Sequence, residues 1–518
     1  MKTGRYDAVL ECNEKIANKL VCAAVCMGNF QKMSGSYVLP IPNVQPSLIP
    51  FVTIGYEAYF NVPMIDFISE NIVKMSFSSN AVITVLDGIN VAFGLAFSIE
   101  IAPAYNAVNR QFTIDFKKAT ITQVKISGIS LHQNVLNKLC EIMSIVFKEY
   151  LENKVSPVTI TPVLYSLQLP NTTKDITINL GGTRITDSII MAGFDFLSYT
   201  GGDVSRVTDF TCGNDFSIGL SENGVRRVFD FWWVNTTYPK TFQKNYSWSF
   251  DTSEYDDWLD WLLTAFALAT GGAGWIFWAI VNLVVDVNEV SAEYGYKIDI
   301  GKPALDLLDG NKIQVSGEMD VDLWAKLYLK IAVHYPWETK KYKKKIGSYT
   351  NNDVKIRYSA EGKVYLDGGN RLVGDIVDFD IEVSGLLPDA PEFLLNRILN
   401  AIIDEMIESY PLIVISSAII EKGIPGTKLT LNVKVKTLEV NTEEAILSAN
   451  LHIKGMENYC KPPYIANKNP RSLEVHASNC TRLKRVLEHH KVPYFFLDDA
   501  LEDGYDGCYY CLRQLSRR

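Results

Sequence analysis

The sequence lacks the common signatures of catalysis. It contains six histidines in 518 residues, and none of them follows the H-E-x-x-H pattern of metalloproteases. It has no G-x-S-x-G nucleophile elbow, no G-x-x-x-x-G-K-[ST] phosphate-binding loop and no G-x-G-x-x-G after a strand. The adjacent acids Asp498 and Asp499 have the spacing of solvated helix caps, not of catalytic pairs. We therefore expect a protein that is not an enzyme.

An excess of positive charge is also missing. Lys and Arg total 50, Asp and Glu total 59, and the net charge is −9. Because contact with phosphates requires a basic surface, no nucleic-acid partner is expected. Residues 1–9 are not followed by the apolar stretch of a secretory signal, which predicts a cytoplasmic protein or one released without a signal peptide. Nine cysteines in a chain of this length are too sparse for a disulfide scaffold.

The sequence is rich in long stretches of alternating apolar residues. Apolar residues dominate every second position from Ile89 to Ile101 and from Met319 to Val333, which is the period of a strand. At about 3.3 Å per residue, these strands would be roughly 40 to 50 Å long. Shorter runs of the same kind predict strands over 377–383, 429–435 and 447–453.

Apolar residues at steps of three or four predict three helices. The helices are expected over Val9 to Met27, Leu131 to Leu151 and Pro388 to Ile407. On the first of them, Glu11 and Lys19 fall outside the apolar stripe.

The second half of the chain repeats the plan of the first. Tyr6–Leu10 matches Phe216–Leu220, and the Ser127-Gly128 junction before a helix matches Ser384-Gly385. The second copy is longer, and the block around Asp251 to Val290 interrupts its strand pattern. Such repetition indicates internal duplication of one long-stranded unit.

With these features the sequence resembles the tubular lipid-binding (TULIP) superfamily, which includes bactericidal/permeability-increasing (BPI) proteins. It is most similar in type to the bacterial TULIP accessory proteins of clostridial neurotoxin gene clusters. The resemblance rests on the segments Tyr6–Met27 and Asp215–Trp233, on the long alternating strands and on the two Ser-Gly junctions, and it covers residues 1–455. It implies an α+β fold of two elongated modules, in each of which a long curved antiparallel sheet wraps a long helix and encloses a tubular cavity.

The resemblance also gives a domain organisation. We expect one module over 1–212, a second over 213–455 with an insertion over 251–290, and a small zinc-binding unit over 456–518. No residue can be assigned to the ligand cavity from the sequence.

The insertion contains the most apolar segment of the chain. Residues 258–285 carry one charge, Asp260, but three glycines within 271–274 disfavour a continuous helix. Each arm of about 12 residues would be roughly 18 Å long, too short to cross a bilayer. We favour a helical hairpin that is buried, self-associates or dips into a membrane; a true span is the third possibility. Four tryptophans near its turn and its base are expected to contact a membrane or a partner: Trp258, Trp261, Trp275 and Trp278.

A lysine-rich loop is predicted after the longest strand. Five lysines within six positions stand beside aromatic residues, and each would contribute on the order of 1 kcal/mol at an anionic membrane surface. The alternative is a solvated hairpin tip. The five are Lys340, Lys341, Lys343, Lys344 and Lys345.

The tail carries a compact set of metal-ligand residues. His476-x-x-x-Cys480 is followed by Cys508-x-x-Cys511, and one His and three Cys in two close pairs suit one tetrahedral, structural zinc ion. Alternatives are a disulfide between Cys508 and Cys511 and unligated thiols.

Part of this tail resembles Ada-like zinc-binding modules. The resemblance is carried by Leu497–Cys508, although His476 stands where a fourth Cys is typical, which argues against methyl-accepting thiol chemistry. His489 and His490 are alternative ligands, but we expect them to be exposed.

Together these features predict non-enzymatic binding or transfer of lipids or other elongated apolar ligands, with docking to anionic membranes as a peripheral protein. The competing interpretation is a protein-interaction or chaperone-like accessory, for example one associated with a toxin, whose tubes are filled by side chains. The expected partners are a hydrophobic ligand, an anionic membrane surface and a protein.

Overall fold

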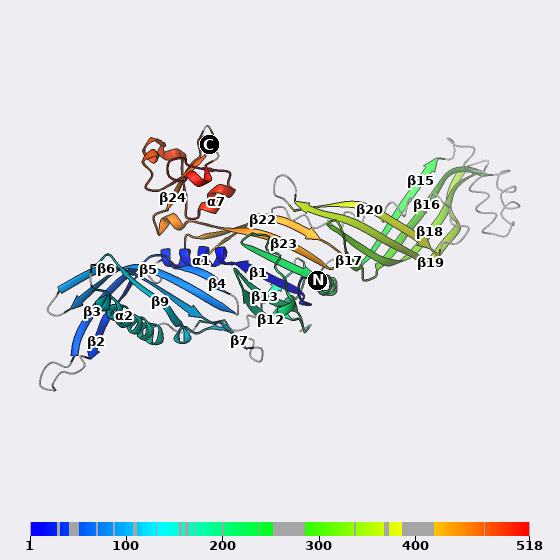
Figure 1. Cartoon of the computed structure of the whole chain (residues 1–518). Coiled ribbons are helices and arrows are strands. Elements are labelled where there is room, and N and C mark those ends of the chain that lie inside the picture. Colours follow the sequence, from blue (N-terminus) through cyan, green and yellow to red (C-terminus); the bar gives the residue numbers. More distant parts are fainter. Residues whose placement is uncertain are drawn as a thin grey trace.

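The computed structural model shows an elongated chain made mostly of antiparallel sheet with few helices (Figure 1). A six-stranded sheet lies at each end, an eight-stranded sheet joins them, and the C-terminal unit lies beside α1 (Glu14–Cys26), near the junction of the first end sheet with the eight-stranded sheet. The structure describes residues 2–27, 32–40, 51–68, 71–85, 89–106, 111–130, 132–154, 158–160, 165–169, 171–198, 201–237, 239–251, 285–335, 338–366, 372–385, 419–470 and 472–516.

The first end sheet has the strand order β2-β3-β5-β6-β9, with β4 added beside β5. The predicted strand 89–101 is confirmed as β6, and the second predicted helix is confirmed as α2 (Gln133–Lys154). The helix packs on the sheet through a core in which the rings of Phe97 and Phe147 stack with centroids 3.8 Å apart. The strands are β2 (Lys32–Pro40), β3 (Phe51–Phe60), β4 (Met64–Ile68), β5 (Ile72–Val85), β6 (Ile89–Ile101) and β9 (Thr120–Ser127).

The second end sheet has the same plan, β15-β16-β18-β19-β20 with β17 beside β18. The predicted strands 319–333 and 377–383 are confirmed within β18 and β20. The strands are longer than expected, since β18 has 24 residues and β19 has 29. The strands are β15 (Thr241–Asp251), β16 (Val285–Ile300), β17 (Ala304–Leu308), β18 (Lys312–Tyr335), β19 (Glu338–Leu366) and β20 (Leu372–Ser384).

The central sheet, β11-β12-β13-β1-β14-β23-β22-β21, joins the two halves symmetrically. The matched segments Tyr6–Leu10 and Phe216–Leu220 pair with each other antiparallel, with Val9 opposite Gly219. Each then pairs outward with a hairpin of its own half. The predicted strand 429–435 corresponds to β22, which begins one residue later, and the predicted strand 447–453 lies in β23. The strands are β1 (Ala8–Asn13), β11 (Tyr165–Gln168), β12 (Asp175–Thr186), β13 (Ile189–Phe196), β14 (Phe216–Ser221), β21 (Ile419–Gly423), β22 (Thr430–Val440) and β23 (Glu444–Lys454).

The first helix begins later than predicted. Residues 8–13 form β1 because both of their edges are paired, and α1 (Glu14–Cys26) follows. The Asn13 side chain starts the helix by accepting the N–H groups of Lys15 and Ile16. In the second half, α3 (Glu222–Asn235) follows β14 in the same way, with Ser221 as its cap.

Glycines shape the sheet around Tyr6, just before β1. A Cβ at Gly181, Gly182, Gly193 or Gly202 would overlap the Tyr6 ring. The ring therefore lies directly on β12 and β13, where the register shifts between residues 180 and 182.

The C-terminal unit is a small sheet of order β26-β24-β25-β27 with a short helix. Its core is formed by Ala466, Val475 and Ala500. Its elements are β24 (Tyr464–Asn467), β25 (Glu474–Ala477), β26 (Lys491–Tyr494), β27 (Asp506–Gly507), α7 (Leu497–Glu502) and the 3-10 turns η4 (Met456–Asn458), η5 (Thr481–Arg485), η6 (Glu488–His490) and η7 (Arg513–Leu515). The remaining elements of the chain are β7 (Ala104–Asn106), β8 (Gln111–Ile114), β10 (Val158–Ile160), η1 (Phe116–Lys118) and η2 (Val204–Arg206).

Two predicted features fall outside the described residues. The helix expected over Pro388 to Ile407 is one, and most of the insertion, residues 252–284, is the other. Residues 285–290, at the end of the predicted insertion, belong to β16, which pairs with β18. Among the described residues, no helix is both long enough and apolar enough to span a membrane.

Candidate metal centre

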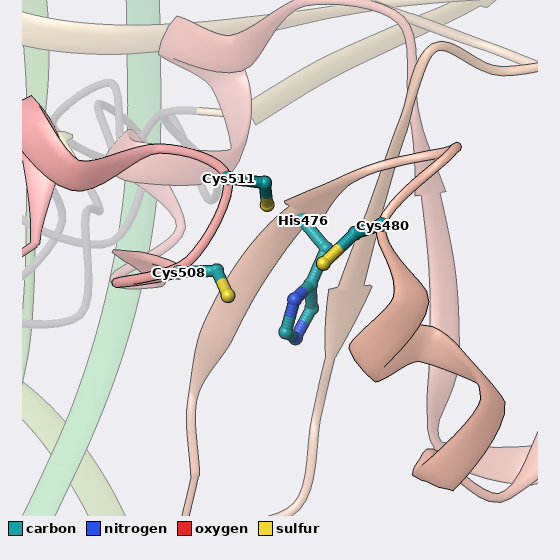
Figure 2. A group of neighbouring side chains, drawn as sticks. All are labelled: His476, Cys480, Cys508 and Cys511. Atoms are coloured by element: carbon teal, nitrogen blue, oxygen red, sulfur yellow. The ribbon is translucent and has the colours of Figure 1, made fainter.

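The four predicted metal ligands come together at one end of the small C-terminal sheet. His476 lies in β25, and Cys508 follows β27, which pairs with β25 in parallel. Cys480 and Cys511 lie in the turns that follow these two strands. The ligand atoms all lie within 4.8 Å of one another, and Figure 2 shows the three sulfurs and the imidazole around one small space.

Two tight turns hold the thiols in place. The Cys508 carbonyl accepts the N–H groups of Cys511 at 3.2 Å and Leu512 at 2.8 Å, and the Cys480 N–H donates to the Ala477 carbonyl at 2.9 Å. The Ala477 N–H in turn donates to the Cys511 sulfur at 3.4 Å. A hydrogen bond of this kind orients a thiolate ligand and stabilises its charge.

The protonation chemistry of the cluster fits a bound cation. His476 is 3% exposed, and neither ring nitrogen has a hydrogen-bond partner among the described residues. Burial lowers the pKa of His476, so the ring is neutral, and burial raises the pKa of the Cys511 thiol to about 12. A divalent cation would accept the unused imidazole lone pair and stabilise the thiolates, and one His with three Cys is a donor set for tetrahedral zinc.

The structure also bears on the alternatives to this ligand set, a Cys508–Cys511 disulfide and ligation by His489 or His490. Cys508 and Cys511 are free thiols in the structure. His489 and His490 lie in η6 with their ring centroids 4.2 Å apart, and they are not members of the cluster. The structure therefore gathers His476 and the three cysteines alone among the candidate ligands of this unit.

A buried ion-pair cluster anchors this unit to the rest of the chain. The Lys19 ammonium of α1 donates to Asp215 at 2.7 Å, to Asp499 of α7 at 2.6 Å and to the Leu451 carbonyl of β23 at 2.8 Å. The side chains of Lys19, Asp215 and Asp499 are each at most 8% exposed. The prediction of Asp498 and Asp499 as solvated caps is thus wrong for Asp499, and Lys19 is buried although it lies outside the apolar stripe.

Further carboxylates in and just after α7 face lysines of the other two units. Glu502 pairs with Lys436 and also accepts a hydrogen bond from Asn450, while Asp503 pairs with Lys434. Asp498 pairs with Lys15, but both of these side chains are more than half exposed. The acidic side of the small unit thus lies against basic residues of α1 and β22.

The lysine-rich segment is a strand and not the predicted loop. β19 begins at Glu338 and pairs antiparallel with β18, with Lys340 opposite Val333 and Lys344 opposite Leu329. The long edge of β18 is available for pairing, so the lysine segment extends the sheet. Lys341, Lys343 and Lys345 share one exposed face, and Lys343 pairs with Glu293 at 3.0 Å.

Trp258, Trp261, Trp275 and Trp278 lie outside the described residues. The neighbouring described residues are Asp251, at the end of β15, and Val285, at the start of β16. Val285 pairs with Val333, which pairs with Lys340, so the chain re-enters the sheet beside the lysine segment.

No protein-family model and no curated protein matches the sequence. Similar solved structures include a lipopolysaccharide binding protein, with 9% identity over 86% of this chain and 99% of that one and a TM-score of 0.29. They also include P47 from Clostridium botulinum A2, with 11% identity, 87% and 98% coverage and a TM-score of 0.36, and P47 of Clostridium botulinum E1, with 10% identity, 87% and 100% coverage and a TM-score of 0.36. Proteins of these kinds are the ones that the sequence was expected to resemble. Overlaps this loose carry no conclusion about function.

Proposed function

We propose that the chain is a non-enzymatic protein that binds or transfers lipids or other elongated apolar ligands. We further propose that it consists of two TULIP modules, over 1–212 and 213–455, and a zinc module over 456–518. The identical strand order of the two end sheets and the near-symmetric pairing of β1 with β14 support the two modules.

One observation carries the ligand proposal: an apolar row on β20 continues beyond the packed core. Val383 and Ile381 pack against the buried cluster of the second end sheet, whereas Phe379 in the same row is 38% exposed. Val377, at the adjacent bulge, is 52% exposed. Among the described residues, the apolar row of β20 therefore extends past the part that the core covers. Such an uncovered apolar row suits an acyl chain lying along the strand.

A different observation favours the accessory interpretation. In the first end sheet the space between α2 and the strands is occupied by stacked aromatic side chains, with Phe77 on Phe97 and Phe97 on Phe147. A tube filled in this way has no room for a ligand at that point. The second end sheet thus supports ligand binding, whereas the first end sheet supports the accessory interpretation.

Native mass spectrometry of the purified chain, with extraction and identification of co-purified lipid, separates them. We expect bound lipid, and we expect Phe379→Asp to reduce its occupancy severalfold because a buried charge opposes apolar contact. Leu487→Asp, at a 59% exposed residue of the C-terminal unit, is the matched control and should leave occupancy unchanged. A lipid-free protein that forms a stable complex with another protein would support the accessory interpretation.

We also propose that the exposed lysines of β19 and the tryptophans of the insertion contact anionic membranes. Neutralising Lys340, Lys341, Lys343, Lys344 and Lys345 together should weaken co-sedimentation with phosphatidylserine vesicles at low salt, while binding of the wild type should fall as salt rises. Unchanged binding of this variant would contradict the role of the lysines.

Finally, we propose that His476, Cys480, Cys508 and Cys511 bind one structural zinc ion. Such a small unit has too little core to be stable alone. Metal analysis should find about one zinc per chain in the wild type, a loss of zinc in Cys508→Ser, and retention in His489→Ala. Chelation should make residues 456–516 sensitive to proteolysis, and a metal-free but protease-resistant wild type would contradict the assignment.

A further inference from the structure

A second group of thiols lies at the junction between the C-terminal unit and the rest of the chain. Cys22 and Cys26 are on α1, and Cys460 follows η4 at the start of the C-terminal unit. All three belong to one apolar cluster with residues of β23, in which Cys26 is buried and the other two are half-buried. None of them takes part in the metal cluster.

Cys26 occupies the middle of this group. Both Cys22 and Cys460 pack against the apolar cluster that contains Cys26, and burial together with these two neighbouring thiols raises the pKa of Cys26. The position of Cys460 is fixed by its backbone, because its N–H donates to the Met456 carbonyl at 3.0 Å. Two cysteines from chain regions more than 400 residues apart thus lie in one apolar cluster.

Helix geometry decides which pair can form a covalent bond. Cys22 and Cys26 are four residues apart on α1, and at this spacing their Cβ atoms lie about 5–6 Å apart. A disulfide needs Cβ atoms about 3.5–4.5 Å apart, so this pair would require the helix to distort. Cys460 comes from another element and is free of this constraint.

We propose that Cys26 and Cys460 form a reversible disulfide that locks the C-terminal unit onto α1 under oxidising conditions. The bond would lie two helical turns from Lys19, on the helix that already carries the buried ion pairs to α7. The site is therefore a redox lock on a contact that is otherwise held by charge and apolar packing.

The oxidant is a low-molecular-weight disulfide such as oxidised glutathione. The half-buried Cys460 thiolate attacks one sulfur of the oxidant, forming a mixed disulfide and releasing one reduced glutathione thiolate, which takes up the proton that Cys460 lost. The Cys26 sulfur, losing its proton, then attacks the Cys460 sulfur and releases the second reduced glutathione. Two protein thiols are oxidised, one glutathione disulfide is reduced, and the protein loses two hydrogen atoms.

Burial makes this reaction slow and pH-dependent. It raises the pKa of both Cys22 and Cys26, so little thiolate is present at neutral pH. The rate of locking should therefore rise with pH.

The test is disulfide mapping on the full-length, zinc-supplemented protein after incubation with oxidised glutathione. A cross-linked peptide pair containing Cys26 and Cys460 is expected in the wild type and in Cys22→Ser, and it should be absent from Cys460→Ser. The same pair should return to free thiols with dithiothreitol. A wild type that yields only glutathionylated Cys460, or only a Cys22–Cys460 or Cys22–Cys26 bond, would overturn the proposal, as would complete resistance of all three thiols in a protein that oxidises elsewhere.

Discussion

Two ionisable residues of the same strand–helix segment, Glu11 on β1 and Lys19 on α1, are both buried, but they differ in the partners that surround them. The Lys19 ammonium contacts the carboxylates of Asp215 and Asp499. Burial alone lowers the pKa of Lys19, but the two carboxylates outweigh it and the net shift is upward. Glu11 has one hydrogen bond, from the Phe210 N–H at 2.8 Å, and its second carboxyl oxygen has no partner among the described residues.

The difference shows what a buried ionisable group needs. Where partners converge from several parts of the chain, the charge is retained and joins those parts. Where they do not, the group keeps its proton, and burial raises the pKa of Glu11 to about 8. The Lys19 cluster is therefore a contact between units, whereas Glu11 is a neutral member of the central sheet.

Breaking the Lys19 cluster should have the largest effect. Lys19→Met leaves two buried carboxylates without a cation, and we expect the free energy of unfolding to fall by about 3–5 kcal/mol in urea denaturation. Asp499→Asn in the same background should restore part of this loss, because it removes one of the unpaired charges. Lys15→Met is the matched control: its pair with Asp498 is exposed, and the loss should stay below about 1 kcal/mol. Equal losses of stability in Lys19→Met and Lys15→Met would show that the buried ion pairs of Lys19 contribute no more than an exposed pair.

The comparison also shows which features the sequence could reveal. The strand at 89–101 was predictable because alternation is local, and the four ligands His476, Cys480, Cys508 and Cys511 because they come in two short pairs. Their pairs meet through the single parallel contact between β25 and β27. Such signals are contained within a few residues, or within one small unit.

The Lys19 cluster could not be predicted in this way. Its members Asp215 and Asp499 are separated from Lys19 by 196 and 480 residues. The residues on either side of each acid give no sign that it is buried. Likewise, β1 was included in the first predicted helix, because Val9, Cys12 and Ile16 have helical spacing and the flanking strands that pair with β1 lie about 200 residues away. Tertiary pairing overrides the local pattern in both cases.

Titration of Glu11 should have the next largest effect. Its folded-state pKa of about 8 lies above the ordinary value of 4.5, so the native state binds the proton more tightly than the unfolded state. The free energy of unfolding therefore falls as pH rises from about 4.5 to about 8, by a few kcal/mol from this group. Glu11→Gln should be more stable than the wild type above pH 8 and should lose this slope, as measured by denaturation at several pH values. Glu439→Gln, at an exposed position, should keep it; an unchanged slope in Glu11→Gln would show that Glu11 ionises normally.

The smallest of the three effects should come from the packing of Tyr6 against β12 and β13, beside β1. A methyl group at Gly193 would overlap the Tyr6 ring, so Gly193→Ala must displace Tyr6 from β13. We expect a loss of about 1–3 kcal/mol, as for other overpacked cores. Burial raises the pKa of Tyr6 to about 12, and displacement into solvent should bring the pKa back toward 10, visible as phenolate absorbance at lower pH. Gly374→Ala is the control, because no atom lies within 4 Å of the position that its methyl group would take, and its stability should change by less than about 0.5 kcal/mol. If Gly193→Ala lost stability while the tyrosine titration stayed the same, the strain would lie in the β12–β13 backbone and not in the packing of Tyr6.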